Sequence, residues 1–318
     1  MKSAKDLRIV YMGTPDFAVA PLRALVEGGY NVVAVVTTPD KPSGRGLKVN
    51  ESAVKRYAVE AGLPILQPVK LRDEEFVEAF RALDADLGIV IAFRMLPEII
   101  WSAPKMGTFN LHASLLPQYR GAAPINRAIM NGETVTGVTT FLLNPQIDEG
   151  AIIGQVKVDI EPADNVGTLH DKLMNVGTDL VLETVEKLAA GETRPIEQSK
   201  VECGELKPAP KIFKEDCHID FGRSGEEIIN QVRGLSPYPA AWASLTDTLT
   251  VKIFDVSFEP GDNVRSAGEV VSDDKRYIKV ACADGYISIK ELQLSGKKRM
   301  SAEELLRGFR NICSYTFN

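Results

Sequence analysis

The sequence is poor in the residues that build metal sites and disulfide frameworks. Among 318 residues there are only 3 histidines and 4 cysteines. The cysteines form no C-x-x-C pair and the histidines no H-x-x-x-H pair, which argues against a zinc site of the usual spacing and against metal catalysis. A chain of this length needs no disulfides for stability, so we expect reduced thiols and a cytoplasmic protein.

The sequence also lacks a basic excess and a long apolar run. It has 37 Lys and Arg against 43 Asp and Glu, a net charge of −6, which argues against a protein that coats nucleic acid indiscriminately. The longest apolar stretch, residues 87–101, is interrupted by Arg94 and Pro97, so we expect no membrane span. With 44% hydrophobic and 25% charged residues, the composition is globular, and the length suits two domains.

Residues 7–190 alternate short apolar runs with longer amphipathic ones. Strands are predicted at 7–12, 31–37, 86–92, 107–112, 135–144 and 152–160, and helices at 16–28, 51–61, 72–82 and 166–190. Strands that alternate with helices form a parallel sheet with helices on both faces. We therefore predict a Rossmann-like α/β domain over residues 1–190.

The rest of the chain has a different pattern. Residues 191–210 lack periodicity and carry three prolines, which predicts a linker. A helix is expected at 224–235 and another from Ser301, which begins a capping-box pattern. Between them, strands are predicted at 241–246, 249–258, 267–273, 277–283 and 286–294. Short strands at this spacing indicate a small β-barrel or sandwich over residues 211–318.

Ligands of a parallel sheet bind beyond the carboxyl ends of its strands. The turn after the first strand, residues 13–18, has no G-x-G-x-x-G pattern, which argues against a nicotinamide enzyme. The loop 38–48 after the second strand is rich in Gly and Pro and carries Lys41, Arg45 and Lys48. We predict an irregular loop here, which is either a phosphate or RNA contact or a solvated surface loop.

The strand at 107–112 carries the clearest chemical pattern. Asn110 and His112 alternate on it, so their side chains share one face at its carboxyl end. An imidazole can act as acid or base near neutral pH, and an amide can donate to a developing oxyanion. Asp148, in a loop between two predicted strands, is a candidate partner that would hold the imidazole. Sequence spacing alone leaves open whether His112 and Asp148 meet.

These motifs resemble those of the folate-dependent formyltransferases. The resemblance rests on N-x-H at 110–112, S-L-L-P at 114–117, R-G-A-A-P at 120–124 and D-x-G at 148–150. The first turn G-T-P-D-F, the G-R-G of the basic loop and the second region are similar to the methionyl-tRNA formyltransferase family. Nearly the whole chain takes part in this resemblance.

The resemblance implies an activity and a set of residues. It implies 10-formyltetrahydrofolate as formyl donor, the amino group of methionyl initiator tRNA as acceptor, a role in translation initiation and an OB-like second domain that binds tRNA. Asn110, His112 and Asp148 would be catalytic, with Asn110 and His112 hydrogen-bonding the oxyanion and His112 moving protons with Asp148. The implied folate contacts are Phe93, Met95, Leu96, Ser114, Leu115, Leu116, Pro117 and Asp148. The tRNA contacts we expect are Lys41, Arg45, Lys48, Lys297, Lys298 and Arg299.

One segment departs from the family pattern, and other functions stay open. Members of the family often have Ala-Tyr-Gly before the Leu-Pro of the folate-side loop, whereas this chain has a shorter A-F-R-M-L-P at 92–97, and Arg94 has no role by analogy. The alternatives are another folate-dependent formyltransferase, acting on an amino sugar or a purine precursor, and a non-catalytic RNA-binding protein. No long exposed apolar helix is evident, so we expect a monomer.

Overall fold

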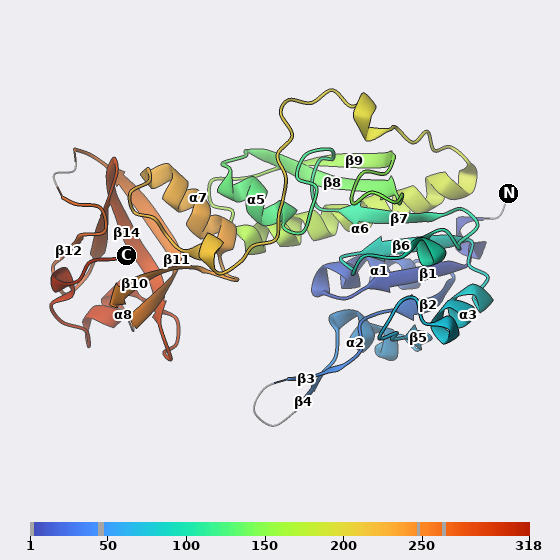
Figure 1. Ribbon diagram of the computed structural model, residues 1–318, viewed down its shortest axis with the longest axis horizontal. Helices are drawn as coiled ribbons and strands as arrows, with labels where there is room; N and C mark the ends of the chain where they lie inside the picture. The colour runs from blue at the N-terminus through green and yellow to red at the C-terminus, as the bar shows by residue number, and fades with distance from the viewer. Residues whose placement is uncertain (1–2, 44–47, 247–248, 263–264) are drawn as a thin grey trace. The chain divides into compact units, whose positions relative to one another are not determined.

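The computed structural model describes residues 3–43, 48–246, 249–262 and 265–318 (Figure 1). The chain divides into two compact units. Unit 1 comprises Met1–Gly121, Thr136–Asp159 and His170–Pro208, and unit 2 comprises Ala122–Val135, Ile160–Leu169 and Ala209–Asn318. The two units interleave along the sequence. The domain borders that we placed at residues 190 and 210 stay a prediction.

Unit 1 is built on one sheet of seven strands. In spatial order these are β5 (Ile65–Leu66), β2 (Val32–Val36), β1 (Ile9–Gly13), β6 (Leu87–Ile91), β7 (Thr108–His112), β8 (Val135–Leu142) and β9 (Ile152–Asp159) (Figure 1). The first five are parallel to their neighbours, and β8 runs antiparallel to β7. Central strands such as β1 and β6 are fully buried, which is why their sequences are continuous apolar runs. The predicted parallel-sheet α/β fold is confirmed.

Helices cover both faces of this sheet. They are α1 (Val19–Glu27), α2 (Ala53–Glu60), α3 (Glu74–Ala82), α4 (Glu98–Trp101) and α6 (Val166–Ala190), with a 3-10 turn at Asp16–Ala18. The helices α3 and α4 pack on the face that presents Val10 and Val90. On β7, Leu111 faces α6, where a Cβ on Gly177 would lie 2.8 Å from the Leu111 side chain. Because side chains alternate along a strand, Asn110 and His112 point to the opposite face from Leu111.

The basic loop after β2 is not irregular throughout, so that prediction was wrong. The strands β3 (Lys41–Ser43) and β4 (Lys48–Asn50) pair as an antiparallel hairpin that extends from the sheet beside α2 (Figure 1). The proline in this hairpin suggested a loop. In a two-stranded ribbon, however, one edge of each strand is unpaired, so a proline whose missing N–H lies on that edge removes no hydrogen bond between the strands. Lys55 of α2 ties the start of the hairpin down, with Nζ 2.5 Å from Asp40 Oδ2.

Unit 2 contains an antiparallel sheet of six strands. Its order is β10 (Ala241–Thr246), β11 (Leu249–Pro260), β14 (Gly285–Leu294), β13 (Ile278–Cys282) and β12 (Val270–Ser272), with β15 (Met300–Ser301) paired to β14. Register shifts in β11 around Asp255 bend this sheet, as bulges do. The predicted small β-barrel of the second region is confirmed in the form of this antiparallel sheet.

In the described part of unit 2, three α-helices accompany the sheet. They are α5 (Pro124–Met130), α7 (Gly225–Leu235) and α8 (Ala302–Leu306). Ser301 caps α8 in a capping box, as predicted. The helix α5 was not predicted from the sequence. It packs on α7, where Asn126 donates to the Gly234 carbonyl at 2.8 Å.

The segment that we predicted as a linker makes specific contacts with unit 1. Residues 196–208, which we call the strap, begin where Ile196 forms an antiparallel bridge with Ile152 of β9. A 3-10 turn follows at Gln198–Lys200, and the Gln198 side chain is only 4% exposed. A covalent connection alone would not require a buried polar side chain, so these contacts indicate a further role for the strap.

Candidate active site

The carboxyl end of β7 brings the predicted acid–base residue into a buried position. His112 is 7% exposed, and its Nε2 lies 2.9 Å from the carbonyl oxygen of Tyr119. A carbonyl can only accept, so Nε2 carries the hydrogen. In the neutral ring the lone pair therefore sits on Nδ1. This backbone carbonyl, which sequence reasoning did not identify, sets the tautomer of the ring.

Asp148 faces the basic nitrogen of this ring. Its Oδ2 lies 3.9 Å from His112 Nδ1, and its side chain is 15% exposed. The same Oδ2 accepts a hydrogen bond of 3.0 Å from the Gly121 N–H. A distance of 3.9 Å is long for a hydrogen bond but suits an ion pair once Nδ1 is protonated. The structure thus brings together the two residues whose meeting the sequence left open.

Asn110 completes the predicted set. It pairs with Val90 of β6 and Phe141 of β8 in the sheet, two residues before His112 on the same face. Its buried Oδ1 has no hydrogen-bond partner within the described residues. Burying an amide oxygen without a partner is unfavourable, and such exceptions gather where a ligand supplies the missing bond.

The loop that carries Asp148 has an unusual backbone. We call residues 143–151 the Asp148 loop. Asp148 itself has a φ of 54°, in the left-handed region. At Gly150 the backbone passes so close to β8 that a Cβ would lie 1.6 Å from the Leu142 carbonyl oxygen. No side chain fits there, which explains the glycine of the D-x-G motif.

The loop 92–97, expected on the folate side, is anchored by Arg94. Its guanidinium donates to the Val69 carbonyl at 2.8 Å and also to the Pro68 carbonyl, and it lies 5.6 Å from the centre of the Phe93 ring. Partial burial lowers the pKa of Arg94. Leu96 is buried in the core beside β6, whereas Met95 is 72% exposed. Arg94, for which analogy offered no role, therefore holds the shape of this loop.

The expected folate residues 114–117 differ in what their side chains do. The Ser114 hydroxyl donates to the Gln118 carbonyl at 2.6 Å, and Leu116 packs on Phe141. Leu115 lies against Gly137 of β8. These contacts are internal packing, whereas Pro117 lines a cavity.

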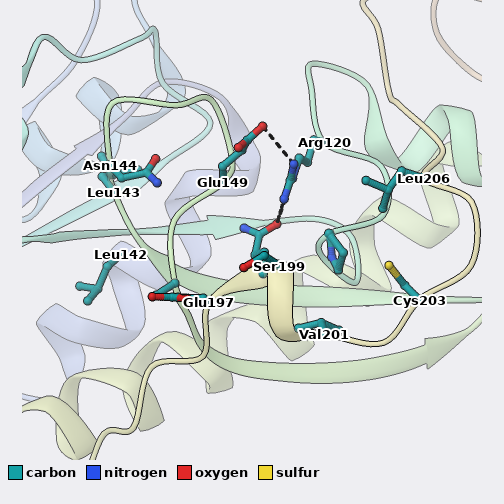
Figure 2. A pocket seen from close by; sticks show the side chains of 13 residues that line it. Arg120, Leu142, Leu143, Asn144, Glu149, Glu197, Ser199, Val201, Cys203 and Leu206 are labelled. Carbon is teal, nitrogen blue, oxygen red and sulfur yellow. Dashed lines mark hydrogen bonds and ion pairs between the residues drawn. The ribbon is translucent and has the colours of Figure 1, made fainter.

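A cavity of about 740 Å³ borders the Asp148 loop (Figure 2). The Asp148 loop and the strap contribute most of its wall. Arg120 also lines it and lies between two of its polar partners, with Nη1 3.0 Å from Glu149 Oε1 and Nη2 2.7 Å from Gln198 Oε1. Asn110, His112 and Asp148 are not among the lining residues, so the cavity adjoins the predicted catalytic set without containing it.

The predicted tRNA contacts fall in two places. Lys41 and Lys48 belong to the β3–β4 hairpin, whose side chains are not described, and Arg45 lies outside the described residues. Lys297, Lys298 and Arg299 are exposed in unit 2 between β14 and β15. Arg299 is paired with Glu291 and lies 4.4 Å from the centre of the Phe254 ring.

Metal ligation and membrane insertion each require a recognisable arrangement of residues. Within the described part of the chain, no group of three or more His, Cys, Asp or Glu is arranged to hold a metal ion. Over the same residues, no helix combines the length and the apolar character that crossing a membrane requires.

Comparison with known proteins shows the family of the chain. Residues 7–185 match a family model described as formyl transferase, and residues 211–310 match one described as formyl transferase, C-terminal domain. The chain is 57% identical over 319 residues to a methionyl-tRNA formyltransferase of Bacteroides thetaiotaomicron, with 99% of each chain covered. It is 50% identical to one of Flavobacterium johnsoniae, with 96% of each covered.

Solved structures share the fold at lower identity. An N-formyltransferase from Helicobacter canadensis, in complex with folinic acid and dTDP-3-aminofucose, aligns with a TM-score of 0.67 at 19% identity, covering 92% of this chain and 100% of that one. HypX from Aquifex aeolicus with tetrahydrofolic acid aligns with a TM-score of 0.63 at 18% identity, covering 94% and 47%. The sequence matches, which span both units, decide the family: the chain belongs to the methionyl-tRNA formyltransferase family of formyl transferases.

Proposed function

We propose that this protein transfers the formyl group of 10-formyltetrahydrofolate to the amino group of initiator methionyl-tRNA. The observation that carries the proposal is the 57% identity to a methionyl-tRNA formyltransferase over 99% of both chains. The amino-sugar enzyme shares only the fold at 19% identity, so it gives no comparable support for a sugar acceptor. A cytoplasmic location and a monomeric state are part of the proposal.

The chemistry of the site suits an acyl transfer to an amine. The acceptor amine attacks the formyl carbon as a neutral group, so it must lose a proton as the new C–N bond forms. His112 Nδ1 carries the lone pair that takes this proton, because Nε2–H is donated to Tyr119. The Asp148 carboxylate, 3.9 Å away, stabilises the imidazolium that results.

In this proposal, Asn110 forms hydrogen bonds with the reacting atoms themselves. Its unpaired Oδ1 accepts a hydrogen from the attacking amine, and its amide N–H donates to the formyl oxygen as that oxygen gains negative charge. The C–N bond to the folate nitrogen then breaks, and the proton held on Nδ1 passes to that nitrogen. The products are the formylated amine and tetrahydrofolate, and the ring of His112 returns to its neutral form.

The two co-substrates are assigned to different sets of residues. We assign folate to the loop 92–97, Pro117 and the Asp148 loop, since these border the face of β7 that carries Asn110. We assign tRNA to the β3–β4 hairpin with Lys41, Arg45 and Lys48, and to Lys297, Lys298 and Arg299. Cations that contact phosphates make binding fall as salt rises. Arg45→Ala should therefore raise the KM for tRNA and reduce its salt dependence, with folate binding unchanged.

The direct test is formylation by the purified protein. Methionyl initiator tRNA and methionyl elongator tRNA are each incubated with 10-formyltetrahydrofolate, and formylmethionine is measured after deacylation. We expect product from the initiator tRNA, and loss of product with His112→Ala at unchanged thermal stability. Formylation of an amino-sugar nucleotide with none on methionyl-tRNA would overturn the proposal, as would full activity of His112→Ala.

A further inference from the structure

A buried glutamine of the strap holds the Asp148 loop. Gln198 is 4% exposed and comes from a segment 50 residues further along the chain than Asp148. Its Nε2 donates both hydrogens to backbone carbonyls of the loop, to Asp148 O at 2.8 Å and to Gly150 O at 2.9 Å. One side chain thus fixes the backbone on both sides of residue 149.

The other end of the same amide is bound by Arg120. The Oε1 of Gln198 accepts hydrogen bonds from Arg120 Nε at 3.0 Å and from Arg120 Nη2 at 2.7 Å. Guanidinium groups only donate and carbonyls only accept, so the amide has one permitted orientation and all its hydrogen-bonding capacity is used. Glutamate in this position would keep the acceptor for Arg120 but have no hydrogen for the two carbonyls.

Arg120 extends the network to the residue between these carbonyls. Its Nη1 lies 3.0 Å from Glu149 Oε1, so Gln198 and Arg120 together contact three successive residues of the loop (Figure 2). Residues Arg120 and Gly121 are adjacent, and the Gly121 N–H binds the Asp148 carboxylate. The loop is therefore held at its backbone by the strap and at its carboxylate by the segment that follows β7.

We propose that Gln198 is a positioning residue, which sets where the Asp148 carboxylate lies relative to His112 Nδ1. The inference rests on the proposed function, because the cost of misplacing Asp148 appears in formyl transfer. A carboxylate that stabilises an imidazolium must be placed accurately, and a displacement of about 1 Å at a reacting group can cost on the order of 100-fold in rate. Gln198 touches no reacting atom itself.

Two substitutions separate the functions of this side chain. Gln198→Glu retains length and the acceptor for Arg120 but removes the two donors, and Gln198→Met retains length and volume but removes all the hydrogen bonds. Lys200→Ala is the matched control, because Lys200 is an exposed residue of the same 3-10 turn. Hydrogen exchange is measured over residues 145–151 and over α3, and kcat and KM are measured with both substrates.

We expect both Gln198 variants to exchange faster over residues 145–151, with exchange over α3 unchanged. Their kcat should fall by about 10- to 100-fold while the KM for tRNA stays near wild type, since remote misplacement affects the chemical step. Lys200→Ala should match wild type. Wild-type kcat in Gln198→Glu would overturn the proposal, because the Arg120 contact would then suffice. Unchanged exchange over residues 145–151, or faster exchange over α3 as well, would also overturn it.

The exchange measurement needs no substrate, so the two proposals can fail separately. If the wild-type protein did not formylate methionyl-tRNA, the proposed function would be lost, yet the exchange rates would still decide whether Gln198 holds the loop. If formylation occurs and the Gln198 variants retain both exchange protection and kcat, only the positioning role is lost.

Discussion

Asp148→Asn is the most specific test of the proposed mechanism. Asparagine has nearly the same shape, and its Oδ1 can accept the Gly121 N–H that Oδ2 of Asp148 accepts at 3.0 Å. Gln198 binds the backbone carbonyls of the loop, which the substitution does not alter. The variant therefore removes the negative charge facing His112 and leaves the loop in place.

The distance to the ring sets the size of the effect. Unit charges at the observed 3.9 Å attract by about 4 kcal/mol at an effective dielectric constant of about 20. This attraction exists only when Nδ1 is protonated, so it stabilises the proton-transfer step and not substrate binding. About 1.4 kcal/mol corresponds to tenfold in rate, and some screening reaches the partly exposed carboxylate. We therefore expect kcat to fall roughly 100- to 1,000-fold with little change in either KM.

Single-turnover formylation of methionyl-tRNA measures this directly, with thermal unfolding as the check on the fold. Asp159→Asn is the control, since Asp159 lies exposed at the end of β9 and the substitution makes the same change of charge. Near-wild-type turnover in Asp148→Asn would remove the carboxylate from the mechanism. An equal rate loss in Asp159→Asn would show that overall charge, and not the charge beside His112, is responsible.

Three further predictions concern the supports of the site and the second unit. Gly150→Ala should lower both thermal stability and kcat, because its Cβ would lie 1.6 Å from the Leu142 carbonyl oxygen, whereas Gly204→Ala, with nothing within 4 Å, should do neither. Arg94→Ala leaves two carbonyls without a donor, so we expect a loss of about 1–3 kcal/mol in unfolding free energy. In steady-state kinetics, the KM for folate should rise more than the KM for tRNA. Hydrogen bonds from Arg223 and Ser224 lower the pKa of Glu227 from 4.5 to about 2; the stabilisation is therefore complete above pH 4.5 and is lost as the pH falls to about 2. In urea unfolding, the stability difference between wild type and Glu227→Gln should shrink over that range, and a constant difference would contradict the assignment.

Features that depend on local sequence were predicted well. Residues 31–37 and 86–92 are apolar runs because both faces of a central parallel strand are buried, and the periodicity of residues 166–190 coincides with α6. Alternation along a strand likewise places Asn110 and His112 on one face from their spacing alone. Each of these inferences needs only neighbours within a few residues, so the order of amino acids contains the information.

Contacts between distant segments were decided by the tertiary structure. Whether Asp148 reaches His112 depends on a loop that folds back over β8, and its left-handed backbone leaves no periodic signal. Arg120 and Gln198 are 78 residues apart, and Gln198 belongs to a segment whose lack of periodicity predicted only a linker. The tautomer of His112 is set by a backbone carbonyl, which every residue possesses. Residue types and their spacing show which groups can do the chemistry, whereas the atoms that face one another depend on how separate segments pack.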